Sequence, residues 1–232
     1  MPRVRSLLAL GALSLLAACS PSVNQAYKAS IDQRVAGLHP SGTHYDAPAS
    51  AEPMPIAVGQ WSRYKLVDSD GHPGFISYNV VGESDGAYWL EMLQESYTSR
   101  LVTLMLVDLG DRRDPSTVDV KQMKQKTNDD AVNELPSSML SLMKPMWGSI
   151  IESLVVDLHD KPQEAAEAPA GSFDACYKVQ ATVSFAGKSW TSVGWSHPAV
   201  PLSGAVKTRG VDNPSAMDLI DFGTTGAKSE LM

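Results

Sequence analysis

The chain has 232 residues, of which 43% are hydrophobic, and its formal net charge is −7 at pH 7. This length and composition suit one domain with a real core, or one domain with a tether. An acidic chain without a basic stripe argues against nucleic-acid binding and against electrostatic docking on anionic lipid. We therefore expect no nucleic-acid partner, and attachment to a membrane would need an anchor.

The first nineteen residues have the layout of an export signal. Arg3 and Arg5 give a positive start, residues 7–16 form a short apolar core, and small residues precede Cys19. This is the pattern of a secretory signal with a small-residue cleavage site. The core is too short to span a bilayer, which needs about 20 apolar residues. Residues 1–18 are therefore predicted to be a signal peptide.

The run Leu16-Ala17-Ala18-Cys19 resembles the lipobox of bacterial lipoproteins. The resemblance implies that lipid alkylates the Cys19 thiol, that Cys19 begins the mature chain, and that acyl chains hold the protein on a membrane. In that family, an aspartate after the cysteine favours the inner membrane. Ser20 stands there in this chain, which implies the periplasmic face of the outer membrane. The alternative is an ordinary signal peptide with a chance cysteine.

Lipidation of Cys19 leaves Cys176 without an intramolecular partner, because the chain has two cysteines. The fold is then not held by a disulfide, even in an oxidising compartment. An unpaired cysteine in an exported protein is either a buried, inert thiol or a reactive one. The buried thiol is the favoured reading, since free cysteine is among the most buried residue types.

The segment after the anchor predicts a helix and then a linker. Residues 22–38 carry apolar side chains at helical spacing, and Ser22 can cap the start. Residues 39–55 hold four prolines among small residues, which predicts an extended linker. We therefore expect residues 19–55 to comprise a lipidated N terminus, a short helix and a linker. Residues 56–232 are then a β-rich periplasmic domain.

Strand patterns dominate that domain. Aromatic and β-branched residues mark its first strand, and Asp85-Gly86 is a strong signal for a hairpin turn. A lysine-rich strand beginning near Val118 suits the edge of a sheet, because lysine discourages pairing with other chains. The strands predicted in this way cover about residues 59–67, 76–80, 87–94, 99–109, 118–126, 173–185, 190–196, 200–206 and 217–222.

One helical stretch interrupts the strands. From Pro136 to Leu154 the apolar residues follow a period of 3.6, with a kink or a second start at Pro145. Residues 160–170 are acidic and alanine-rich and predict a solvated loop. The expected fold class is α+β. About nine mostly antiparallel strands form a curled, half-barrel-like sheet, and the helical insertion packs on its concave face.

Metal and catalytic motifs are weak in this chain. No two of the five histidines sit at metal-ligand spacing on a predicted helix. Asp68, Asp70 and His72 resemble the start of a calcium loop, but Pro73 and Asn79 stand where that loop needs glycine and an acid. No nucleophile elbow or phosphate loop occurs, and no flanking motif marks the second cysteine as a nucleophile. We therefore expect no metal, no cofactor and no enzymatic activity.

Methionine and tryptophan side chains suggest a ligand. Methionine is flexible and polarizable, which suits variable apolar partners, and a curled sheet lined by tryptophan can enclose an apolar cavity. The alternative is that these side chains simply form the core. The ligand-binding residues predicted on this basis are Trp61, Trp89, Met139, Met143, Met146, Trp147 and Trp195.

The order of elements over residues 56–222, together with the lipoprotein signal, resembles the LolA/LolB-type lipoprotein carriers. The resemblance implies a half-barrel closed by helices that binds acyl chains in an apolar cavity; it carries no binding residues over. The main hypothesis is a non-enzymatic, membrane-tethered module for an apolar ligand such as lipid. A structural or assembly lipoprotein with an envelope protein partner ranks close to it. An envelope hydrolase or thiol enzyme is less favoured.

Overall fold

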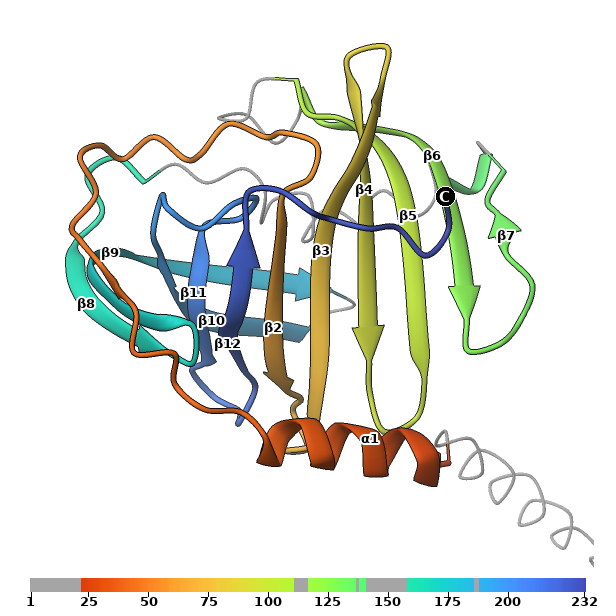
Figure 1. Ribbon diagram of the computed structural model, residues 1–232, viewed down its shortest axis with the longest axis horizontal. Helices are drawn as coiled ribbons and strands as arrows, with labels where there is room; N and C mark the ends of the chain where they lie inside the picture. Colours follow the sequence, from red (N-terminus) through yellow and green to blue (C-terminus); the bar gives the residue numbers. More distant parts are fainter. Residues whose placement is uncertain (1–21, 111–116, 137, 141–157, 186–187) are drawn as a thin grey trace, which may run out of the picture.

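The residues that the computed structural model describes are 22–110, 117–136, 138–140, 158–185 and 188–232. Twelve strands form one sheet (Figure 1). In this part of the chain, the one helix longer than a single turn is α1 (Gln25–Ala36). The strands are β1 (His44–Tyr45), β2 (Trp61–Val67), β3 (Pro73–Ser84), β4 (Ala87–Glu95), β5 (Arg100–Asp108), β6 (Asp119–Thr127), β7 (Asn133–Glu134), β8 (Gln163–Ala168), β9 (Gly171–Phe185), β10 (Lys188–Ser196), β11 (Ala205–Gly210) and β12 (Ala216–Gly223).

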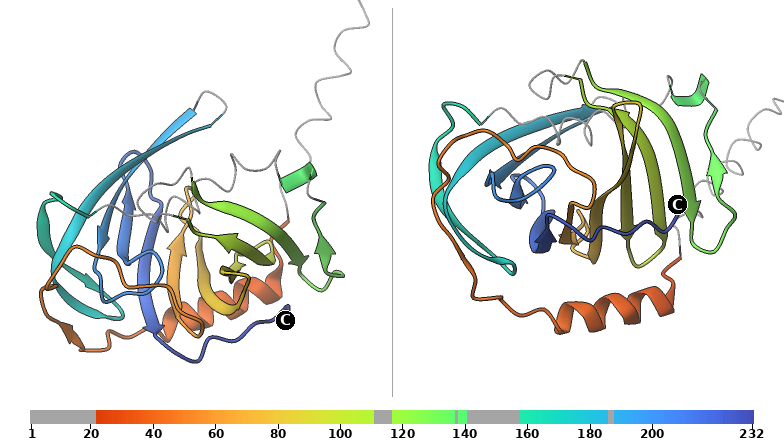
Figure 2. Two further views of the ribbon diagram at one scale, coloured as in Figure 1. Left: turned by 90° about the horizontal axis from the view of Figure 1, so that it is seen from above. Right: turned by 45° about the horizontal axis from the view of Figure 1, so that its top comes forward.

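The sheet runs in the order β1-β9-β10-β11-β12-β2-β3-β4-β5-β6-β7, and β8 pairs with β9. Every pairing is antiparallel except that of β1 with β9. The sheet curls, so that β8 contacts β11 and β12, but in the described strands its two ends do not pair (Figure 2). The curled, mostly antiparallel sheet is confirmed. The class is mostly β, however, and the α+β prediction holds only in part.

The Asp85-Gly86 hairpin turn is confirmed. Both residues have positive φ, 51° and 76°, as a two-residue turn of type I′ requires. β3 and β4 then pair from Ser84 and Ala87 onward. This turn fixes the register of the two strands, and the register decides which side chains share each face of the sheet.

Alternation along β2 separates the two faces of the sheet. Ser62 and Tyr64 are fully buried on the inner face, whereas Trp61 and Arg63 lie on the outer face. The inner face carries the main hydrophobic core, which fills the inside of the curl. Buried members of this core include Tyr64, Val80, Leu90, Met92, Met105, Val107, Met123, Phe173, Val200, Leu202, Val206 and Leu219.

The segment predicted as a linker is folded onto the sheet. Tyr45 in β1 stacks on the buried ring of Phe173, with ring centroids 4.4 Å apart and an interplanar angle of 10°. Its centroid also lies 5.4 Å from that of Phe222 in β12. Residues 44–45 therefore pack on the same sheet as the strands after residue 56, and the division of the chain at residue 56 stays a prediction.

Helix α1 is attached to the sheet as well. It lies across the strand ends at the β2–β3 and β4–β5 turns (Figure 1). Its buried residue is Ile31, and the Asn24 backbone N–H donates to the Tyr97 carbonyl at 2.8 Å. The cap predicted at Ser22 is wrong. The Asn24 side chain caps the helix by accepting from the backbone of Ala26 at 3.0 Å and from the next amide at 3.2 Å.

Two segments differ from their predicted secondary structure. The acidic stretch at 160–170 was expected as a loop, but it contains β8, in which Ala166 packs into the core while its charged neighbours face outward. The stretch at 200–206 was expected as a strand, but β11 begins only at Ala205. Positive φ at Leu202 (66°) breaks the extended geometry. The Leu202 side chain enters the core from a loop. Its spacing from the core residues Val200 and Val206 nevertheless gives the sequence the alternation of a strand.

Most of the predicted helical insertion falls outside the described residues. Residues 138–140 are helical, whereas 141–157, which hold Met143, Met146 and Trp147, are not described. The packing of this insertion on the concave face therefore stays a prediction. No helix in the described ranges has the length and apolar character needed to cross a membrane.

Cys176 is a fully buried thiol of the core. In a regular strand Phe173 and Cys176 would lie on opposite faces, but Ala175 adopts a positive φ of 51° and breaks the alternation, so both side chains enter the core. Burial raises the pKa of the Cys176 thiol to about 12. A protonated, inaccessible thiol reacts poorly with electrophiles.

We therefore expect Cys176 to resist a maleimide in the folded protein and to react fully after denaturation. Labelling followed by mass spectrometry measures this directly. Ser172→Cys, an exposed position on the same strand, is the matched control and should react in the folded state. Rapid native labelling of Cys176 would contradict the buried assignment and reopen the thiol-enzyme hypothesis.

His197 is buried beside Phe173, and its ring bridges two backbone groups. Its Nε2 lies 3.0 Å from the Asp46 carbonyl oxygen, and its Nδ1 accepts from the Ala199 amide at 3.2 Å. A carbonyl only accepts, so Nε2 carries the proton and the ring is neutral. Burial lowers the pKa of His197, and the Asp46 carbonyl and the Asp174 charge offset this in part.

A lowered pKa predicts acid sensitivity of the fold. The unfolded chain takes up a proton near pH 6.5, before the folded chain does, so the free energy of unfolding falls as the pH drops from 6.5 towards the folded pKa. Urea titrations between pH 7.5 and 5 should show this slope. In His197→Gln, whose amide offers a donor and an acceptor, the slope should shrink. An equal slope in both proteins would show that another group is responsible.

Candidate binding groove

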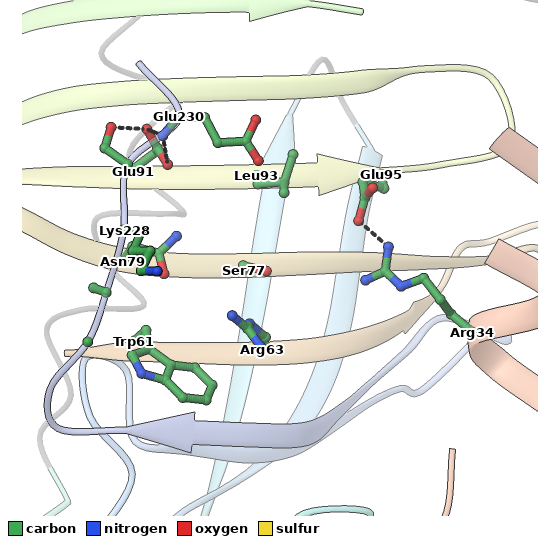
Figure 3. A pocket seen from close by; sticks show the side chains of 13 residues that line it. Arg34, Trp61, Arg63, Ser77, Asn79, Glu91, Leu93, Glu95, Lys228 and Glu230 are labelled. Carbon is green, nitrogen blue, oxygen red and sulfur yellow. Dashed lines mark hydrogen bonds and ion pairs between the residues drawn. The ribbon is translucent and has the colours of Figure 1, made fainter. Parts of the chain in front are cut away.

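The candidate site is a groove on the outer face of β2, β3 and β4. Helix α1 closes one end, and residues 224–232, here called the strap, cross the strands at the other (Figures 1 and 3). The groove has a volume of about 520 Å³. Its lining residues are Arg34, Trp61, Arg63, Ser77, Asn79, Glu91, Leu93, Glu95, Gly226, Ala227, Lys228, Ser229 and Glu230.

Strand register builds the floor of the groove. Because strands lie about 4.8 Å apart, each row of three outer-face residues is about 10 Å wide. Polar Ser77 and Asn79 occupy the middle strand, so the centre of the floor offers hydrogen-bonding groups. The two rows, taken from β2 through β3 to β4, are Trp61–Asn79–Glu91 and Arg63–Ser77–Leu93.

Trp61 forms one corner of the floor and is fixed from several sides. Its Nε1 donates to the Thr225 carbonyl at 3.0 Å. Gly223 lies so close that a Cβ there would stand 2.7 Å from Nε1, so this position needs glycine. The Arg63 guanidinium carbon lies 4.4 Å from the ring centroid, as in a cation–π contact. The ring therefore holds the guanidinium at the edge of the groove.

Glu91 holds the strap in place. Its carboxylate is only 1% exposed and accepts hydrogen bonds from the Ser229 hydroxyl at 2.5 Å, the Glu230 amide at 2.9 Å and the Leu231 amide at 3.2 Å. Hydrogen bonds to an ionised acceptor are the strong ones in proteins. Two further contacts hold the start of the strap, namely that of Thr225 with Trp61 and a bond from the Ala227 amide to the Gly59 carbonyl at 2.8 Å.

The wall near α1 is a network of ion pairs. Arg34 of α1 donates to Glu95 at 2.5 Å, and its guanidinium carbon lies 3.8 Å from the centroid of Phe75. Arg100 pairs with Glu230 of the strap and lies 3.7 Å from Glu95. The hydrogen bond with Glu230 raises the pKa of the Arg100 guanidinium, which keeps its charge. Helix, sheet and strap are thereby joined at this wall.

The structure does not bring the predicted tryptophans together. Trp61 lines the groove. Trp89 lies on the outer face of β4 beside Gly82, with the Lys124 amine 5.9 Å from its ring centroid. Trp195 in β10 donates to Glu164 at 2.5 Å and has lysines beside its ring.

The predicted methionines divide in the same way. Met139 is 50% exposed and does not line the groove. Met143, Met146 and Trp147 fall outside the described residues. The described members of the predicted set therefore do not line one apolar cavity. Ligand binding by Met143, Met146 and Trp147 stays a prediction.

Imidazole and carboxylate side chains gather in two places, and within each group the possible ligand atoms lie within 4.8 Å of one another. One group is His44, Asp46 and Asp174, and the other is Asp68, Asp70 and His72. The second group is the turn that resembles a calcium loop in sequence. There the Asp68 carboxylate accepts from the Asp70 and His72 amides at 2.9 and 2.8 Å, which shapes the turn. Five of these side chains are exposed and Asp174 is partly exposed, and the expectation of no metal stays a prediction.

Sequence reasoning missed most of the groove. Arg34 and the strap are brought to β2–β4 by contacts that are remote in sequence, and no local pattern marks them. Two signals were present. Glu91 is a lone carboxylate in the middle of an apolar strand, and Arg63 alternates with buried Ser62 and Tyr64. Both residues indicate a sheet face that carries polar and charged side chains.

No known protein family and no curated protein matches the sequence. Among solved structures, a similar chain is a protein from Bacteroides fragilis described as exported and as having a YmcC-like fold. The TM-score is 0.38 and the identity 12%, over 75% of this chain and 100% of that chain. A likeness this weak carries no argument about function.

Proposed function

We propose that this protein is a lipoprotein, anchored through Cys19 to the periplasmic face of the outer membrane, that binds a small polar ligand in its outer-face groove without catalysis. The single observation that supports binding is the groove itself, with about 520 Å³ of space over a floor of defined register. Sites for small molecules are usually concave and largely formed before the ligand arrives. The support for the anchor is the resemblance of residues 16–19 to a lipobox.

The state of the groove's carboxylates favours binding over catalysis. General acid–base chemistry needs a carboxylate within reach of the substrate proton and free to exchange protons. Glu91 is occupied by donors of the strap. Glu95 pairs with Arg34, and Glu230 pairs with Arg100. These three acids hold the groove together, which is the role of a binding scaffold.

The groove changes the expected chemistry of the ligand. An apolar ligand was expected because tryptophans were assigned to one cavity, but only Trp61 lines this groove, and its ring already faces Arg63. Leu93 is the one aliphatic side chain on the floor rows, between polar and charged neighbours. A ligand that fits must therefore present polar or charged groups.

The anchor predicts a clear cell-fractionation result. Cys19→Ser removes the sulfur that takes the lipid while keeping the size of the side chain, so the protein should move from the membrane fraction to the soluble periplasmic fraction. Cys176→Ser is the control and should stay with the membrane, because this thiol is buried in the core. Equal distribution of the wild type and Cys19→Ser would contradict anchoring through Cys19.

Photo-crosslinking in cells tests the groove. A photoreactive residue at position 79 faces the centre of the floor, whereas one at position 65 lies on the same face but outside the groove. We expect position 79 to capture a small molecule that mass spectrometry detects as an added mass, and position 65 not to. Capture of a protein instead would favour the assembly hypothesis. Absence of any adduct at position 79 would count against ligand binding.

A further inference from the structure

Resting on the proposed binding function of the groove, we propose that its ligand is held by a phosphate group, bound between Arg63 and Lys228. This assigns the class of ligand and the two residues that recognise its charge. Figure 3 shows both side chains at the groove, one from β2 and the other from the strap.

The charges of the lining single out these two cations. Arg34 is neutralised by Glu95, and Glu230 is neutralised by Arg100. Within the described residues, no carboxylate lies at salt-bridge distance from Arg63 or Lys228. Glu91 also has no ion-pair partner among the described residues and is held by neutral donors of the strap, so with Arg100 counted the groove keeps a net positive charge.

The position of Arg63 is set before a ligand arrives. Its guanidinium lies 4.4 Å from the centroid of the Trp61 ring, and that ring is fixed by the Thr225 carbonyl and by close contact with Gly223. A guanidinium held in this way loses less conformational freedom when it binds than a free surface arginine does. The cation–π contact does not occupy the N–H groups of the guanidinium, so these groups remain available to donate to a ligand.

The neutral groups beside the cations complete an anion site. Ser77 lies across from Arg63 in the β2–β3 pairing, and Asn79 lies across from Trp61. A hydroxyl and an amide there can donate to oxygens that the two cations do not reach. Lys228 approaches from the strap and supplies a point charge, whereas the arginine fork suits two oxygens of one group.

Charge favours phosphate over carboxylate. A phosphate monoester carries about −1.5 to −2 charges at pH 7, so it can pair with both Arg63 and Lys228, whereas a carboxylate carries only one charge. Three or more oxygens also match the spread of donors from Arg63, Ser77, Asn79 and Lys228. The phosphate could belong to a soluble monoester or to a lipid whose headgroup is itself a phosphate monoester, since both present three non-bridging oxygens.

Calorimetric titration of the full chain in detergent tests this proposal. The first probe is inorganic phosphate, and the second is dihexanoyl phosphatidic acid, whose phosphate is a monoester, with dihexanoyl phosphatidylcholine as its zwitterionic diester control. We expect Arg63→Gln to weaken binding of the anionic probe at least tenfold and Lys228→Gln to weaken it severalfold. Arg63→Lys, which keeps the charge but loses the fork, should fall between Arg63→Gln and the wild type.

Lys65→Gln is the matched control. Lys65 lies two residues along the same strand on the same face and does not line the groove, so its loss should change affinity less than twofold. Saturable binding of inorganic phosphate would identify a soluble ligand. Binding of the anionic lipid alone, with the same dependence on Arg63, would identify a headgroup.

Two results would overturn the proposal. One is the absence of saturable binding by either anionic probe, and the other is equal affinity in the wild type and Arg63→Gln. Neither result would overturn the groove's binding function, because crosslinking at position 79 reports any occupant whatever its charge. A captured molecule without phosphate binding would leave the groove as the site and exclude phosphate as its ligand class.

Discussion

Replacing Phe173 by alanine is expected to lower the free energy of unfolding by about 3–5 kcal/mol, the usual cost of removing a buried aromatic side chain. Phe173 is fully buried where β9 meets the aromatic rings of Tyr45, Phe222 and His197. Its loss leaves a cavity and removes the partner on which β1 stacks. Urea unfolding at pH 7.5 measures the effect.

Two further variants serve as controls for Phe173→Ala. Phe173→Leu keeps most of the apolar volume and should cost less, because the cavity term shrinks. Val211→Ala, at a side chain that is 55% exposed, should change the free energy of unfolding by less than about 0.5 kcal/mol. If Phe173→Ala behaved like Val211→Ala, the docking of residues 44–46 on the core would not contribute to stability as the structure indicates.

Replacing Glu91 by alanine is expected to release the strap from the sheet. The variant removes the acceptor of the Glu230 and Leu231 amides and of the Ser229 hydroxyl. Hydrogen bonds to a charged acceptor contribute roughly 1.5–3 kcal/mol. A loss of about 2 kcal/mol in local stability speeds amide exchange about thirtyfold, which hydrogen–deuterium exchange of the peptide over 227–232 measures.

The matched control for Glu91→Ala is Glu83→Ala, on the neighbouring strand. Glu83 is exposed and no strap donor contacts it, so exchange in the strap should not change. Glu91→Gln, which keeps one carbonyl acceptor but replaces the other oxygen by an amide donor, should give an intermediate rate. Unchanged exchange in Glu91→Ala would mean that the strap is held mainly by its contacts with Trp61 and Gly59.

Local pattern was enough to predict the strands between Trp61 and Asp108. There the strands follow one another through short turns, and Asp85-Gly86 has the backbone conformation that its residue types favour. Prediction failed where tertiary contacts decide. Val200 and Leu202 alternate as in a strand, yet they enter the core from a loop. Ala166 lies in an acidic stretch, yet β9 pairs with that stretch and makes it a strand.

The candidate site was less predictable than the fold. Tryptophan was assigned to a cavity because it is large and apolar, but its nitrogen finds acceptors that draw Trp61 and Trp195 to different places, the Thr225 carbonyl and Glu164. The residues that make the groove come from α1, three strands and the strap. Strand register and long-range ion pairs bring these residues together, and neither can be predicted from a single stretch of sequence. The sequence marked only Glu91, as an acid in an apolar strand, and Arg63, as a cation in an alternating strand.

The central claim is that the outer-face groove holds a ligand. Native mass spectrometry of the full chain, purified in mild detergent from its own envelope, tests this most directly, with Ser77→Trp as the comparison. Ser77 lies between Arg63 and Leu93 on the floor, so an indole there fills the groove without disturbing the inner face. We predict that the wild type carries an added mass that Ser77→Trp lacks. An identical bound mass in both proteins, or none in either, would contradict the claim.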